Sequence, residues 1–109
     1  MITAHLHIQT PATRALLKFC CDHKRNGRDV QAIESCLACL ERKDVSAALT
    51  YFQQVPLGGN GCFNDWFPPT VFPHETPEYV SMVFEALVTH WSLMMRLSLP
   101  SVSSNATVA

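Results

Sequence analysis

The residues that could do chemistry are few, and three of them lie near the middle of the sequence. Cys62 is a thiol, Asp65 a carboxylate and His74 an imidazole. Asp65 with His74 could form an acid–base pair, and Cys62 with His74 could form a nucleophile and its base. Spacing alone does not show that these side chains meet. A small ligand-binding protein or enzyme that uses Asp65 and His74 in a loop pocket is therefore one interpretation, beside a protein-interaction module and a metal-dependent regulator that uses His5, His7 and a cysteine.

Two further patterns suggest metal binding, and neither completes a site. His5 and His7 would lie on one face of a strand, but they supply only two ligands. Cys36 and Cys39 form a CxxC pair inside a predicted helix, and no second CxxC follows. We expect the five cysteines to be free thiols, with Cys36 and Cys39 packed in the core. The sequence predicts no metal ion and no cofactor.

The charge of the chain argues against several classes of partner. Its 109 residues carry a net charge of −1, and 48% of them are apolar. This composition excludes wholesale disorder and gives no strong attraction to nucleic acid. The basic residues from His23 to Arg28 suit the negative end of a preceding helix better than a phosphate site. Without an export signal or a long uncharged apolar run, we expect a cytoplasmic protein outside the membrane.

The most informative segment is a loop rich in glycine, proline and aromatic residues at 58–73, which we call the 58–73 loop. Gly58, Gly59 and Gly61 permit unusual backbone conformations, and they are interpreted as structural. Asn64 and Asp65 can bond to nearby backbone and make the loop self-supporting. The same loop could instead present side chains to a partner. It matches neither a phosphate-binding loop nor a dinucleotide-binding fingerprint.

This loop resembles an element of a group of small bacterial proteins of unknown function. They have about one hundred residues, are mostly helical, and share a G-G-x-G-[ST]-[LF]-N-D-like sequence after a helix. The matching residues are Gly58, Gly59, Gly61, Phe63, Asn64 and Asp65. Cys62 replaces the usual small hydroxyl residue, which puts any hydroxyl-based role in doubt. The resemblance spans about residues 37–97 and implies no known activity, although some such proteins look like immunity or accessory proteins.

Helices must position this loop, and the sequence predicts four of them. We expect the first to begin at Thr10 and Pro11 and to end at Asn26 and Gly27. The second should cover 30–42 after an Asp29 cap, and the third 45–54 after an Asp44 cap. The fourth should begin after Thr76 and close before Pro100. The predicted core residues are Leu16, Phe19, Ile33, Leu37, Leu49, Phe52, Phe84, Leu87 and Trp91.

We therefore predict an all-α bundle, with residues 1–99 as one domain and 100–109 as a flexible tail. Residues 45–109 hold only five charged residues but both tryptophans and five of the six phenylalanines. Interfaces favour such aromatic anchors, so a protein-interaction module is the leading interpretation, with an immunity-type or accessory role as its narrower form. The partner would bind the 58–73 loop and the adjacent helix; homodimerisation stays open. The candidate contact residues are Asn64, Asp65, Trp66, Phe67 and Phe72.

Overall fold

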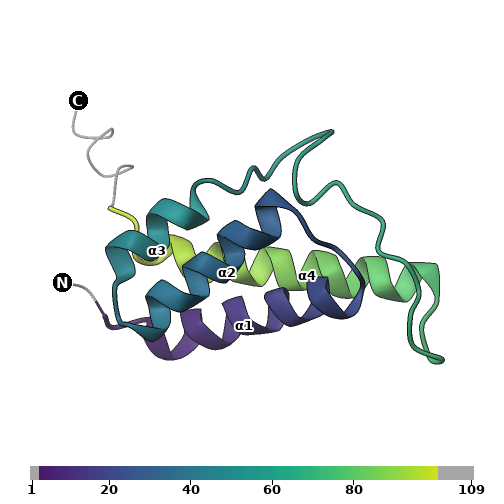
Figure 1. The fold of residues 1–109 in the computed structure, drawn as a ribbon, viewed down its shortest axis with the longest axis horizontal. Coiled ribbons are helices and arrows are strands. Elements are labelled where there is room, and N and C mark those ends of the chain that lie inside the picture. Colours follow the sequence, from purple (N-terminus) through teal and green to yellow (C-terminus); the bar gives the residue numbers. More distant parts are fainter. Residues whose placement is uncertain (1–2, 101–109) are drawn as a thin grey trace.

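The computed structural model describes residues 3–100, and its regular elements are all α-helices (Figure 1). They are α1 (Leu6–Asp22), α2 (Arg28–Glu41), α3 (Val45–Phe52) and α4 (Pro77–Arg96). The prediction of an all-α bundle of about four helices is confirmed. Apart from Pro100, the predicted tail lies outside the described residues. No helix within residues 3–100 is long and apolar enough to cross a membrane.

The helices pack in a chain of neighbours around one core. α1 contacts both α2 and α4, and α3 packs on α2 (Figure 1). An edge-to-face contact between Phe52 and Trp91, with ring centroids 5.0 Å apart, joins α3 to α4. Six of the nine predicted core residues are buried, and Leu37, Leu49 and Leu87 are half-buried. The prediction missed Phe63, which is fully buried although it belongs to a loop.

A buried polar network ties the start of α1 to the end of α4. The Gln9 amide donates to the Met94 carbonyl at 3.0 Å and to the Ser98 hydroxyl at 2.7 Å. Trp91 Nε1 donates to Thr13 Oγ1 at 3.0 Å. These contacts hold the first turn against α4, so α1 begins at Leu6 and the predicted start at Thr10 and Pro11 is wrong. Tertiary contacts outweigh the local signal of Pro11, which lies inside the helix.

The same early start overturns the strand expected around His5 and His7. His5 is the residue that precedes α1, and His7 is an exposed residue of its first turn. Residues two apart on a helix point in different directions, so the two imidazoles do not share a face. The local geometry that suggested a metal site is absent.

The ends of α1 and α2 use lysine where glycine is usual. Lys24 and Lys43 have φ angles of 66° and 64°, in the left-handed region. In each case the following N–H bonds back to a carbonyl of the last helical turn, from Arg25 to Cys20 and from Asp44 to Cys39. The predicted end of the first helix at Asn26 and Gly27 is therefore too late.

The starts of the later helices test the predicted caps. Gly27, with a φ of 117°, precedes α2, and Asp29 lies in the first turn instead of capping it, so that prediction is wrong. Asp44 accepts from the Ala47 N–H and caps α3, as predicted. Thr76 likewise accepts from the Tyr79 N–H, which confirms the start of α4.

Candidate functional site

The connection between α3 and α4, residues 53–76, has no regular secondary structure but is pinned to the core. Phe63 inserts its ring between the helices and contacts Phe84 edge-to-face, with centroids 5.5 Å apart. Its N–H donates to the Pro56 carbonyl at 2.9 Å. A fully buried phenylalanine fixes the middle of the connection as firmly as a helical core residue does.

Asn64 and Asp65 close the glycine-rich part of the loop. The Asn64 side chain accepts from the Gly58 N–H and donates to the Gly58 carbonyl, both at 3.0 Å. Asp65 accepts from the Gly61 N–H at 2.9 Å. Gly61 has a φ of 82°, whereas Gly58 and Gly59 are outside the left-handed region. The two polar side chains thus serve the loop itself, as the self-supporting interpretation expected.

Arg25, in the turn after α1, holds the next part of the connection. Its guanidinium donates to the Phe63 carbonyl at 2.7 Å and lies 4.2 Å and 4.8 Å from the ring centroids of Phe63 and Trp66. Burial lowers the pKa of Arg25, and the nearby Cys20 and Asp29 oppose this. Arg25 remains a cation, because even a lowered guanidinium pKa is far above neutral pH.

His23, two residues earlier, anchors the far end of the connection. Its Nδ1 lies 2.9 Å from the Phe19 carbonyl, and its Nε2 lies 2.7 Å from a carboxylate oxygen of Glu75. The other oxygen of Glu75 accepts the N–H groups of Val71 and Phe72. The His23 and Glu75 side chains in this contact are at most 4% exposed. No local signal pairs residues 52 positions apart, and sequence reasoning missed this contact.

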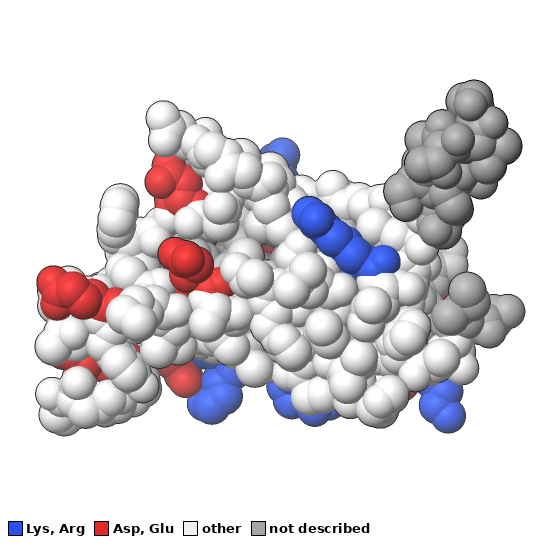
Figure 2. Space-filling model, turned by 180° about the vertical axis from the view of Figure 1, so that it is seen from behind, with Lys and Arg blue, Asp and Glu red and all other residues white. Residues whose placement is uncertain are grey.

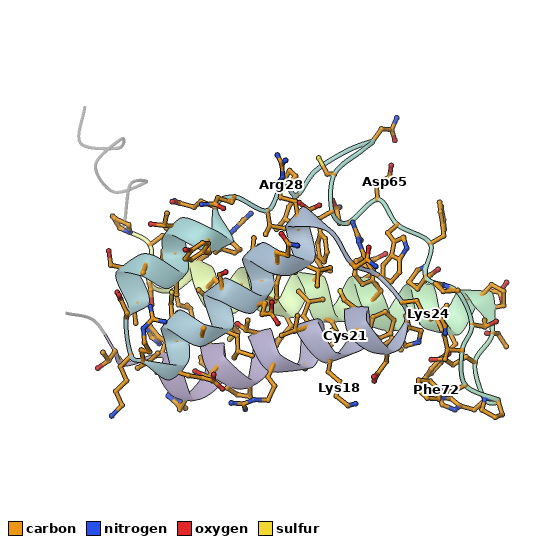
Figure 3. The ribbon with its side chains drawn as sticks, in the orientation of Figure 1. Lys18, Cys21, Lys24, Arg28, Asp65 and Phe72 are labelled. Carbon is orange, nitrogen blue, oxygen red and sulfur yellow. The ribbon has the colours of Figure 1, made fainter. Side chains whose placement is uncertain are left out.

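Between these anchors, a cleft opens beside α4. Its volume is about 390 Å³. Four of the predicted contact residues border it, together with five residues of α4: Asn64, Asp65, Trp66, Phe67, Ser81, Phe84, Glu85, Val88 and Thr89. Phe72 is not among them, and Figure 3 shows it well away from Asp65, at the other end of the connection. The predicted contact set therefore divides into a cleft and a separate aromatic residue.

Phe67 stands out in this cleft because it is 84% exposed. Its neighbours on both sides are held inward: Trp66 is half-buried, with its ring 4.9 Å from that of Phe84, and Pro68 is buried. The backbone at this position is therefore fixed while the phenyl ring projects into solvent.

The residues considered for catalysis are not gathered in the cleft. Asp65 borders it, but Cys62 and His74 do not. His74 instead stacks on Phe72 and meets Tyr79 edge-to-face. Burial raises the pKa values of the Cys20 and Cys36 thiols to about 12, which leaves them protonated and unreactive at neutral pH.

The other candidate patterns lead to structural roles. Cys36 and Cys39 are free thiols buried in the core, as predicted. The basic cluster 23–28 does not form one patch, since His23 and Arg25 turn inward and Lys24 and Arg28 are well separated in Figure 3. Within residues 3–100, no three histidine, cysteine or acidic side chains lie close enough together to hold a metal ion.

Comparison of the chain with models of protein families, with curated proteins and with solved structures finds no match. The resemblance stated from the loop motif therefore stays a prediction.

Proposed function

We propose that this chain is a protein-interaction module that binds a protein partner at the 58–73 loop and the adjacent surface of α4. The observation that carries the proposal is the position of Phe67. A phenyl ring that is 84% exposed, on a backbone fixed by buried neighbours, is available to fill a pocket on another protein. Exposed aromatic side chains of this kind are typical anchors of protein interfaces.

The order of the loop supports this function. The Asn64 and Asp65 side chains bond to loop backbone, and Arg25 holds the Phe63 carbonyl. A loop that is already ordered loses little conformational freedom when a partner binds. The anchors of the connection therefore favour binding by keeping the loop ordered.

The cleft beside Phe67 also limits the chemistry of the partner. Asp65 and Glu85 both border it, and neither forms an ion pair within the described part of the chain. A basic group next to an apolar side chain would complement this surface. An immunity-type or accessory role is the narrower form of the proposal, and it rests on the loop resemblance alone.

A capture experiment with matched variants tests the proposal. Tagged protein, expressed in its native cells, should retain one protein at a constant molar ratio. Phe67→Ser should lose this protein without a change in circular dichroism, because its ring makes little contact with the core. Leu97→Ser, which removes another exposed apolar side chain at the end of α4, should retain it. Equal capture by both variants, or no capture by the wild-type chain, would reject the proposed site.

A further inference from the structure

The outward face of α4 carries a second apolar surface, distinct from Phe67. Met82 and Leu93 are 71% and 53% exposed, whereas Phe84 and Trp91 on the opposite face are buried. Figure 2 shows this side of the molecule with few charged side chains over its centre. A shallow groove of about 530 Å³ follows it, lined by Met82, Glu85, Ala86, Thr89, His90 and Leu93. Exposed apolar surface of this kind commonly marks an interface.

The spacing of these residues is that of a helix that packs on another helix. Met82, Ala86, Thr89 and Leu93 follow each other at intervals of four, three and four residues along α4. This is the alternation of a two-stranded helical seam. The two central positions are small and the two outer positions are large. Small residues at the centre let two helix axes approach closely, and large residues beside them fill the space.

The pattern is complementary to itself when a second α4 runs in the opposite direction. If the two-fold axis passes between Leu87 and Val88, Met82 of each copy faces Leu93 of the other, and Ala86 faces Thr89. The same symmetry places Arg96 of each copy beside Glu78 of the other. Such pairing of one patch with itself is how two-fold dimers are built.

Charge favours this antiparallel arrangement over a parallel one. In a parallel pair Arg96 would face Arg96, and the acidic first turns of the two helices, each with Glu78, would lie at the same end. In the antiparallel pair, Arg96 lies over Tyr79 of the second copy, where cation–π attraction is available. Figure 2 shows acidic groups toward the end where α4 begins and a basic group toward its other end. Opposite charges therefore meet only when the helices are reversed.

We propose that two copies of this chain associate through antiparallel packing of their α4 helices, centred between Leu87 and Val88. The groove shares Glu85 and Thr89 with the cleft of the proposed function but does not include Phe67. Phe67→Ser should consequently dimerise like the wild type. Loss of capture by Phe67→Ser therefore tests the proposed function, and loss of dimerisation by α4 variants tests the proposed dimer.

Cysteine cross-linking tests both the association and its direction. Residues 82 and 93 of one helix are about 16 Å apart, too far to be joined by a disulfide within one chain. In a background that carries Cys21→Ser and Cys62→Ser, Met82→Cys mixed with Leu93→Cys should form a disulfide-linked dimer. Each variant alone should stay monomeric under the same oxidation. Cross-linking of each variant with itself would show a parallel pair, and no cross-linking in any mixture would reject the dimer.

Sedimentation over about 1 µM to 1 mM gives an independent measurement. Wild-type protein should shift from monomer to dimer, and Arg96→Glu should raise the dissociation constant about tenfold or more, because the new glutamate meets the acidic start of the second α4. The double variant Arg96→Glu with Glu78→Lys should restore association, because each new glutamate lies beside a new lysine in the antiparallel pair. Arg28→Glu, on the exposed start of α2, is the matched charge control and should dimerise normally. A wild-type chain that stays monomeric throughout would overturn the proposal.

Discussion

The imidazole Nε2 of His23 lies 2.7 Å from Glu75 Oε2, although the two residues are 52 positions apart in the chain. Both ring nitrogens of His23 face oxygen acceptors, the Phe19 carbonyl and the Glu75 carboxylate. The contact is buried, with both side chains at most 4% exposed, and it joins the end of α1 to the segment that leads into α4.

The ionisation of Glu75 should make the fold less stable in acid. Burial by itself would raise the pKa of Glu75, but hydrogen bonds from Phe72 and Val71 lower it. His23 adds to this, and the pKa falls from 4.5 to about 2. A carboxylate whose pKa is lowered by folding adds stability above pH 4.5, and this contribution disappears as the pH falls through about 2.

Urea unfolding followed by circular dichroism checks this prediction. We expect Glu75→Gln to be less stable than the wild type near neutral pH, and the difference to shrink steadily below pH 4.5. Glu78→Gln, an exposed change in the first turn of α4, should leave the acid dependence of the wild type intact. A difference between Glu75→Gln and the wild type that stays constant into acid would contradict the prediction.

Alanine substitution of two phenylalanines in the same loop should change the stability of the protein by very different amounts. Phe63 is fully buried, so Phe63→Ala should lower the free energy of unfolding by about 3–5 kcal/mol, the usual cost of an emptied aromatic site. Phe67 is 84% exposed, and Phe67→Ala should change it by about 0.5 kcal/mol or less. Denaturant unfolding of both variants is the measurement. Similar losses would mean that Phe63 does not anchor the loop.

Asn64 should control the order of the glycine-rich loop. Asn64→Ala removes the acceptor for the Gly58 N–H and the donor to the Gly58 carbonyl, at a cost of about 1 kcal/mol for each bond. Hydrogen exchange at the Gly58 amide should accelerate strongly, while amides of α4 stay protected. Asn60→Ala, an exposed change at the loop tip, serves as control. Unchanged exchange at Gly58 would argue against the Asn64 bridge.

Arg25 should not be replaceable by lysine. Lysine keeps the positive charge but lacks the planar group that lies over Phe63 and Trp66 while donating to the Phe63 carbonyl. We expect Arg25→Lys to lower the free energy of unfolding by about 1–2 kcal/mol and to shift the Trp66 fluorescence. Arg28→Lys, at an exposed position, should do neither. If the Arg25→Lys protein were as stable as the wild type, only the positive charge of Arg25 would matter for stability, and its planar group would not.

The helices could be predicted where local signals decide the outcome. Asp44 and Thr76 cap their helices because a side-chain acceptor three residues before a free N–H needs no distant partner. The start of α1 could not be predicted, because the Gln9 amide finds its acceptors at Met94 and Ser98, near the other end of the described chain. The ends of α1 and α2 could not be predicted either, because lysine occupies the left-handed position at which glycine usually marks the end of a helix.

The candidate site was predicted only in part for a related reason. The loop and four of its residues could be identified from composition. An ordinary solvent-exposed loop is polar, whereas this short segment combines glycine and asparagine with several large aromatic residues. The inward turn of Arg25 and the Glu75 partner of His23 depend on contacts 38 and 52 residues apart. A basic sequence cluster gives no sign that two of its members serve as anchors in the interior.

The turn that carries His23 and Arg25 has a consequence for the order of folding. The α1, α2 and α3 helices join neighbours along the chain, whereas this turn captures Phe63 and Glu75 across 38 and 52 residues. Contacts across 38 and 52 residues form later in folding than the local contacts between neighbouring helices, because closing a longer loop costs more entropy. The proposed binding loop is accordingly expected to become ordered after α1, α2 and α3, and its lifetime in the ordered state depends on two side chains at the end of α1.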